Sequence, residues 1–249
     1  MIYFTGDTHS DFARLSTDRF PEQKNMSKND YVIICGDFGG LWKKSNETDY
    51  WLKWLADKPF TMLFVDGNHE NFEMLNEYPT EQWNGGKIHK ITDSLFHLMR
   101  GQIFNIDDKK IFAFGGAKSH DIRDGILDPA EPNFKEKYKK LWNNMALFRV
   151  RGVSWWNEEM PSDEEYYEGL KNLEANDWTV DYIVTHCGPN SIIDIFSRGF
   201  YEHDKLTDYL ENIRNKTTFK KWFFGHYHED RMIGDKFVML NEEIVIEGN

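Results

Sequence analysis

The sequence predicts an α/β fold, and three observations lead to this prediction. Six short apolar runs, rich in Val, Ile, Phe and Tyr, have the composition of buried strands. Stretches with helical period or composition separate most of these runs. The chain has 249 residues, 40% of them hydrophobic, so it can bury a sizeable core. We therefore expect one domain over residues 1–249 in which strands and helices alternate.

The predicted elements follow one another along the chain. The apolar runs are Ile2–Thr5, Tyr31–Cys35, Thr61–Val65, Lys110–Phe114, Tyr182–Thr185 and Lys221–Phe224. The helical stretches are Asp49–Asp57, Phe134–Met145, Asp163–Asn176 and Lys205–Asn215. Ser162 and Glu165 have the spacing of a capping box at the start of the third helix. Near the C-terminus, Phe237–Leu240 and Glu243–Ile246 are expected to form a hairpin around Asn241 and Glu242.

The composition limits the class of partner. The formal net charge is −12, so binding to long nucleic acid, which relies on Lys and Arg neutralising many phosphates, is disfavoured. A small phosphorylated substrate remains compatible, because cations held by acidic ligands would reverse the sign of one pocket. Cys35 and Cys187 lack CxxC spacing, and no apolar run is long enough to span a membrane. We expect a cytoplasmic protein, whose oligomeric state the sequence leaves open.

Five of the predicted strands end in a polar cluster. The clusters are Gly6-Asp7-Thr8-His9, Gly36-Asp37, Gly67-Asn68-His69-Glu70, Thr185-His186 and Gly225-His226-Tyr227-His228. In open α/β sheets, ligands bind in the crevice beyond the carboxyl ends of the strands, so five such ends can converge on one place. Each motif alone has a simpler interpretation, since Asp-x-His and Gly-Asp are common in ordinary turns. Their joint occurrence, each after an apolar run, favours a binding site.

The side chains in these clusters are typical of a metal site. Seven of them offer oxygen or imidazole ligands: Asp7, His9, Asp37, Asn68, His186, His226 and His228. Mixed nitrogen and oxygen ligation suits Mn, Fe, Zn, Ni or Co. Seven donors exceed what one ion takes while leaving room for substrate, but they divide between two ions if one carboxylate bridges. Two divalent ions about 3.5–4 Å apart would clamp the attacking and leaving oxygens of an in-line displacement.

This set of motifs resembles the calcineurin-like metallophosphoesterase superfamily, whose pattern is D-x-H, G-D, G-N-H-E, H and G-H-x-H. The resemblance covers nearly the whole chain, and it implies a β-sandwich of two mixed sheets flanked by helices. It implies hydrolysis of a phosphomonoester or phosphodiester by a metal-bound hydroxide. It also implies two ligand sets that share Asp37: Asp7, His9, Asp37 and His228 for one ion, and Asp37, Asn68, His186 and His226 for the other.

His69 is the histidine of the motifs that the ligand set does not use. One interpretation is that it only orients the neighbouring ligand Asn68. The other, which the resemblance implies, is a general acid that protonates the leaving alkoxide. Histidine suits this role because its unperturbed pKa of about 6.5 lies near the working pH.

Substrate-binding residues are expected in the long segment Gly116–Pro161. Protein Ser/Thr phosphatases follow their Gly-Asp motif with Asp-Arg, whereas Phe38 and Gly39 follow here, so a phosphate-binding arginine must come from elsewhere. The segment resembles a stretch found in small bacterial and phage members, and we expect it to cover the metal site partially. Asp121 and Arg149 are candidates for substrate binding, because guanidinium matches phosphate oxygens. A simple surface ion pair between them is the alternative.

Two further alternatives remain at this stage. The adjacent Trp155 and Trp156 either pack in the core, which is common for paired aromatics, or contribute to selectivity. For the whole protein, a nuclease is disfavoured by the acidic charge. A non-catalytic scaffold with the same fold is disfavoured because every ligand position and His69 are filled.

Overall fold

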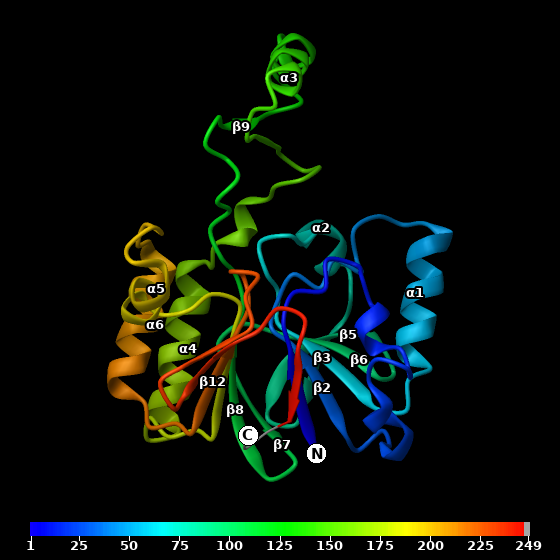
Figure 1. The fold of residues 1–249 in the computed structure, drawn as a ribbon, viewed down its shortest axis with the longest axis vertical. Helices are drawn as coiled ribbons and strands as arrows, with labels where there is room; N and C mark the ends of the chain where they lie inside the picture. Colours follow the sequence, from blue (N-terminus) through cyan, green and yellow to red (C-terminus); the bar gives the residue numbers. More distant parts are fainter. Residues whose placement is uncertain (247–249) are drawn as a thin grey trace.

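Two mixed β-sheets form the centre of the molecule, and helices cover their outer faces (Figure 1). The computed structural model describes residues 1–246. One sheet has seven strands in the order β15-β1-β2-β3-β6-β5-β4, and the other has six in the order β13-β14-β12-β11-β8-β7. This arrangement confirms the predicted α/β sandwich of two mixed sheets flanked by helices.

The elements have the following bounds. The seven-stranded sheet contains β1 (Ile2–Thr5), β2 (Tyr31–Ile34), β3 (Thr61–Phe64), β4 (Thr80–Trp83), β5 (Gly86–Thr92), β6 (Leu95–Leu98) and β15 (Ile244–Ile246). The six-stranded sheet contains β7 (Gln102–Ile106), β8 (Lys109–Phe114), β11 (Tyr182–Thr185), β12 (Lys221–Phe224), β13 (Arg231–Ile233) and β14 (Phe237–Met239). The helices are α1 (Asn46–Ala56), α2 (Phe72–Leu75), α3 (Phe134–Asn143), α4 (Asp163–Ala175), α5 (Asn190–Ser197) and α6 (Lys205–Lys216).

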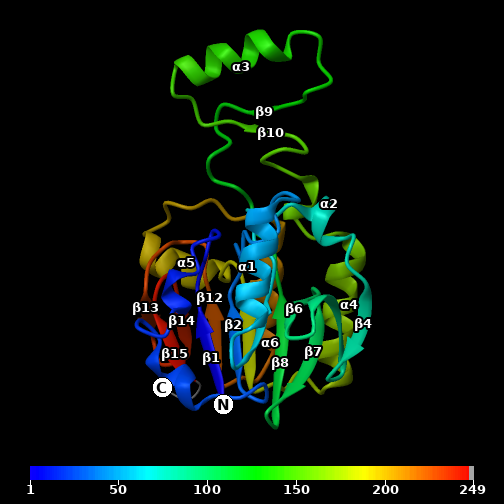
Figure 2. The same cartoon turned by 90° about the vertical axis from the view of Figure 1, so that its right-hand side faces the viewer.

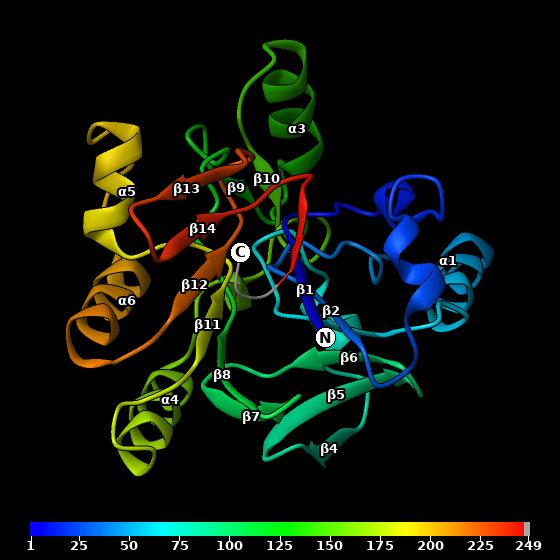
Figure 3. The same ribbon diagram turned by 60° about the horizontal axis from the view of Figure 1, so that its bottom comes forward.

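The core lies between the sheets and beneath the helices. Phe4 of β1 stacks on Phe223 of β12 with ring centroids 3.7 Å apart, so the two sheets meet in a buried apolar layer. Helices α4, α5 and α6 cover the outer face of the six-stranded sheet, whereas α1 lies outside the other sheet (Figure 3). Strands β1, β2 and β3 are parallel, as are β8, β11 and β12. Their carboxyl ends therefore share one edge of the sandwich.

The six predicted strands and four predicted helices are all present, with ends displaced by a few residues at most. The capping box of Ser162 and Glu165 is also confirmed. The predicted C-terminal hairpin is wrong, because β14 pairs with β12 and β13 while β15 pairs with β1 in the other sheet. The Asp230 carboxylate accepts hydrogen bonds from three consecutive N–H groups, residues 241–243, and so turns the chain from one sheet to the other.

Residues 116–161, here called the arm, leave the end of β8 and project away from both sheets (Figures 1 and 2). The arm contains a short parallel pair, β9 (Ile126–Leu127) and β10 (Arg149–Val150), and α3, which buries none of its residues. Only the base of the arm lies beside the predicted metal site. The helix α3 extends outward on its parallel pair of strands (Figure 2), and the expectation of a partial cover over the site stays a prediction.

None of the helices in residues 1–246 is both long enough and apolar enough to cross a membrane.

Candidate metal centre

The seven predicted ligands converge at the shared edge of the two sheets. Asp7, His9, Asp37 and His228 bring one ligand atom each into a group in which all four atoms lie within 4.8 Å of one another. These residues follow β1, β2 and β12, which belong to both sheets. The site is therefore formed only when the sandwich closes.

Asp37 faces both predicted ligand sets. Its Oδ2 atom lies 3.6 Å from His9 Nε2, and its Oδ1 atom lies 3.4 Å from His186 Nε2. On the first side, His228 Nε2 is 3.0 Å from His9 Nε2 and 3.2 Å from Asp7 Oδ2. The two oxygens of one carboxylate are thus directed at two separate groups of donors.

The second group contains His186, Asn68 and His226. His186 Nε2 lies 3.2 Å from Asn68 Oδ1, and the rings of His186 and His226 are 5.0 Å apart between centroids. The Nδ1 atom of His186 donates to the Cys35 carbonyl at 2.8 Å, which leaves Nε2 as the ring nitrogen that faces Asp37. Nitrogen and oxygen donors of this kind are typical of sites for borderline divalent metal ions.

Main-chain groups hold the two aspartates in place. The N–H of His69 donates to Asp37 Oδ1 at 2.7 Å, and the N–H of His226 donates to Asp7 Oδ1 at 3.0 Å. A Cβ on Gly67 would lie 2.0 Å from Asp37 Oδ1, and one on Gly225 would lie 2.0 Å from Asp7 Oδ1. Only glycine allows the neighbouring strand ends to approach these carboxylates so closely.

The backbone is left-handed at four of the seven predicted ligands. The φ angles are +44° at His9, +46° at Asp37, +71° at His226 and +51° at His228. This region is uncommon for residues with a side chain, and such residues concentrate at functional sites, where the surrounding structure holds them. The strained positions coincide with the ligand residues of the motifs, not with the intervening ones.

The electrostatics of the centre favour a cation. Burial by itself would raise the pKa of Asp37, but the neighbouring His186, His69 and His9 outweigh it and hold that pKa below its usual range. Burial opposes protonation of His186, yet Asp37 and Asp7 raise its pKa to about 10. The carboxylates of Asp7 and Asp37 are only 1% exposed, so they require positive charge close by. Metal cations at the same place would supply it.

Asp121 and Arg149 meet beside this centre, at the base of the arm. They form an ion pair, and Arg149 Nη2 lies 3.3 Å from His69 Nε2. Asp121 Oδ1 is buried and has no hydrogen-bond partner. Burial lowers the pKa of His69, Asp37 raises it, and Arg149 lowers it further. The ion pair that the sequence left open as an alternative is therefore present, and it contacts the candidate general acid.

The two tryptophans pack in the core. Trp155 and Trp156 are 9% and 5% exposed, and Trp156 packs edge-on against Trp42 at 5.5 Å. The packing interpretation of this pair is confirmed, because neither side chain lines the hollow beside the metal centre.

Sequence reasoning missed two residues of the site. His120 Nε2 lies 3.2 Å from His226 Nε2, and its ring stacks on Tyr201 at 4.6 Å. Glu70 is buried and accepts hydrogen bonds from the N–H groups of Phe38 and Gly39, directly after Asp37. Glu70 belongs to a recognised motif and could have been found, whereas the lone His120 carried no signal of its own.

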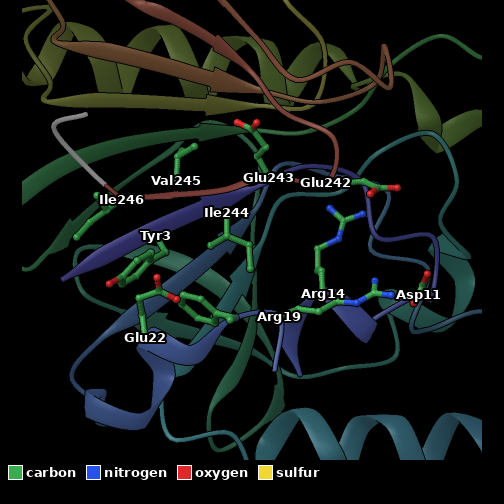
Figure 4. A pocket seen from close by; sticks show the side chains of 11 residues that line it. Tyr3, Asp11, Arg14, Arg19, Glu22, Glu242, Glu243, Ile244, Val245 and Ile246 are labelled. Carbon is green, nitrogen blue, oxygen red and sulfur yellow. The ribbon is translucent and has the colours of Figure 1, made fainter. Parts of the chain in front are cut away.

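A hollow of about 240 Å³ opens over the centre and is lined by Asn68, His69, Asp121 and His226, among others. A larger hollow of about 700 Å³ lies along β15 and carries none of the seven predicted ligands (Figure 4). Arg14 connects the two regions, because it lines the larger hollow and donates to the Asp7 carbonyl at 2.7 Å. Arg14 thus helps to hold the main chain of Asp7, one of the predicted ligands, in place.

The sandwich of two mixed sheets and the donor cluster at its edge define the class of metal-dependent phosphoester hydrolases. The family model of the calcineurin-like phosphoesterases matches residues 1–230, and the chain belongs to that family. Among curated proteins, no sequence matches the chain significantly. The family assignment therefore supports metal-dependent hydrolysis, and the substrate must be inferred from the residues of this chain.

Proposed function

We propose that the chain hydrolyses a phosphomonoester or phosphodiester at a centre of two divalent transition-metal ions, drawn from Mn, Fe, Zn, Ni and Co. The observation that carries the proposal is the position of Asp37, whose two carboxylate oxygens face two separate donor groups. Asp7, His9 and His228 would complete the ligands of one ion, and Asn68, His186 and His226 those of the other. When bound, the ions supply Lewis-acid activation of water and neutralise charge on the phosphoryl oxygens.

Arg149 and His69 act on the substrate in this proposal. Arg149 Nη2 donates to His69 Nε2 when no substrate is bound, so that ring nitrogen is then an acceptor. When the phosphate group of the substrate binds the Arg149 guanidinium, His69 Nε2 loses its contact with Arg149. The negative charge of the phosphate then favours the protonated form of the His69 ring. His69 can then give its proton to the leaving oxygen.

The reaction is a simple hydrolysis. The oxygen of water bonds to phosphorus, and the P–O bond to the alcohol breaks. The alcohol oxygen takes the proton from His69, and the proton that water releases restores the imidazolium.

We further propose a small phosphorylated substrate and a cytoplasmic location. The net charge of −12 opposes the approach of long nucleic acid, whereas a single phosphate group needs only the local charge of the centre.

The proposal is tested by reconstituting metal-stripped protein with Mn²⁺ or Ni²⁺. Elemental analysis is expected to find two ions per chain in the active protein. Asp37→Asn, which halves the negative charge that the two aspartates offer, is expected to lose more than about a hundredfold in activity, since even residues behind the ligands contribute roughly 10–100-fold. The matched control is Asp93→Asn, at a side chain that is 98% exposed.

Two results would count against the dinuclear centre. One is full activity with a single ion or none per chain. The other is an Asp37→Asn variant that keeps both metal content and activity at the level of Asp93→Asn.

A further inference from the structure

A third hollow, here called the trough, lies in the arm and reaches the base of the arm beside the metal centre. Its volume is about 660 Å³, and its walls include Tyr138, Trp142 and Phe148. Asp121 lines both the trough and the hollow over the metal centre. Arg149 also lines the trough, while its guanidinium lies 3.3 Å from His69 Nε2. The trough and the hollow over the metal centre are therefore neighbours, and the Arg149–Asp121 ion pair lies at their boundary.

The walls of the trough are aromatic and exposed. Tyr138 and Trp142 lie one turn apart on α3 with nearly parallel rings, 10° between planes and 6.0 Å between centroids. Phe148 packs edge-on against Tyr138 at 5.4 Å. Trp142 is 66% exposed and Met145 is 89% exposed. Large apolar side chains exposed together are uncommon on a protein surface unless they contact something, and flat aromatic faces favour planar groups.

Polar and charged groups around the trough suit a phosphorylated ligand. The helix α3 contains four lysines and one glutamate, so it contributes +3 to a chain whose total is −12. The helix α3, and not the arm as a whole, is thus a basic segment on an acidic protein, and it would attract an anion toward Arg149. The unpartnered Asp121 Oδ1 could accept a hydrogen bond from a hydroxyl group of the same ligand once the ion pair opens.

We propose that the trough binds a planar aromatic group on the alcohol portion of the substrate, of the kind found in a nucleoside phosphate. The inference rests on the proposed function, because it places the phosphate at the metal centre and Arg149. The aromatic group lies against Tyr138 and Trp142, and the ion pair of Arg149 and Asp121 lies between the trough and the metal centre. Esters of small aliphatic alcohols leave the trough empty and are poorer substrates.

The test compares two substrates that share one ester bond. Adenosine 5′-monophosphate and ribose 5-phosphate both release a primary alcohol, but only the first carries a planar base. Stacking of a base on aromatic side chains supports an advantage of roughly ten- to a hundredfold in kcat/KM for the nucleotide in the unmodified protein. Trp142→Ala, and independently Tyr138→Ala, are expected to remove most of this advantage. Tyr50→Ala, at an exposed tyrosine on α1, is the matched control and keeps it.

Binding is measured in parallel by calorimetry with excess chelator, under which hydrolysis stops. The same preference for the nucleotide should appear in the dissociation constants and should be lost in Trp142→Ala. Metal content and melting temperature of the variants are expected to match those of Tyr50→Ala. Sedimentation of the protein and of Trp142→Ala reports whether a second copy of the chain occupies the trough instead.

The outcomes separate this inference from the proposed function. Equal rates and equal affinities for the two ligands overturn the trough while leaving the phosphoesterase proposal intact. A dimer that Trp142→Ala dissociates, with an unchanged substrate ratio, also overturns it. No hydrolysis of any ester by protein with two metal ions overturns the proposed function, and the calorimetric ratio then decides the trough by itself.

Discussion

The metal centre and the arm are adjacent in space, but they are held in different ways. Each predicted ligand follows a strand of the sandwich, and the two aspartates among these ligands, Asp7 and Asp37, are 1% exposed. Next to it, Asp66 is buried with Arg100 and His97, which hold its pKa below the usual range against the effect of burial. The helix α3, in contrast, buries none of its ten residues.

This difference indicates how the two regions divide the work. Metal ligands need fixed positions, and a closed sandwich provides them because a strand end cannot move without disturbing the core. A ten-residue helix is marginal in isolation, so α3 can change in sequence or position at small cost to the rest of the chain. We therefore expect variants near the sheets and at the base of the arm to affect the chemistry of every substrate, and variants in α3 to affect the choice among substrates.

Among the variants that test this division, the largest effect on the rate of hydrolysis is expected from a substitution of His69, which follows β3. His69→Ala should slow hydrolysis of alkyl esters such as ribose 5-phosphate by about a hundredfold or more, because the alkoxide then leaves without a proton. Hydrolysis of 4-nitrophenyl phosphate should slow much less, since its aryl oxide needs little protonation. Both rates are measured at saturating metal, with His203→Ala as a control at an exposed histidine.

Equal slowing of both esters, with metal content unchanged, would assign His69 to orienting Asn68 and not to proton transfer. Loss of metal in His69→Ala would also contradict the general-acid role, because a residue that only transfers a proton is not needed to hold the ions.

Much of the fold was predictable because its central strands are buried on both faces. β1, β3 and β11 are buried along their whole length, so continuous apolar runs identified them. The meander of β4 and β5 was missed because Thr80–Trp83 is mostly exposed and carries no apolar run. Its two-residue turn, Asn84-Gly85, is nevertheless a typical hairpin signal and could have revealed it.

The prediction of the site from the sequence was limited in the same way. The seven ligand candidates were found because each follows a predictable strand, and parallel strand ends meet at one edge. The approach of His120 to His226 depends on the path that the base of the arm takes across the site, which has no local sequence signal. The C-terminal hairpin failed for a related reason, since Asp230, more than ten residues away, turns the chain between sheets.

An intermediate effect is expected from Arg149, which lies where the arm meets the centre. A charge-assisted contact with phosphate is worth roughly 1.5–3 kcal/mol, so Arg149→Ala should lower kcat/KM by about ten- to a hundredfold for every phosphoester. Metal content should not change. The matched control is Arg151→Ala, two residues further along the arm, whose guanidinium contacts Asn157 and lies over Trp155. An efficiency within twofold of that control would reduce the Arg149–Asp121 pair to a structural contact.

The smallest effect on stability is expected from removing the outer arm. The Asp124 N–H donates to the Leu147 carbonyl at 2.8 Å, so the two chain ends that would remain are already adjacent. A short Gly-Ser linker can therefore replace residues 125–146. Because α3 buries nothing and Leu127 of β9 is the one buried residue of the replaced segment, the free energy of unfolding should change by no more than about 2 kcal/mol, measured by denaturant titration without metal.

The same replacement tests the division between the two regions most directly. Metal content should remain at two ions per chain, and turnover of ribose 5-phosphate should fall no further than in Arg149→Ala, since the linker can only displace that arginine. The advantage of adenosine 5′-monophosphate should disappear, because Tyr138 and Trp142 are gone. Loss of metal, or destabilisation by several kcal/mol, would mean that the arm helps to hold the strand ends. Selectivity and chemistry would then share one structural unit, and differences among esters could not be traced to α3 alone.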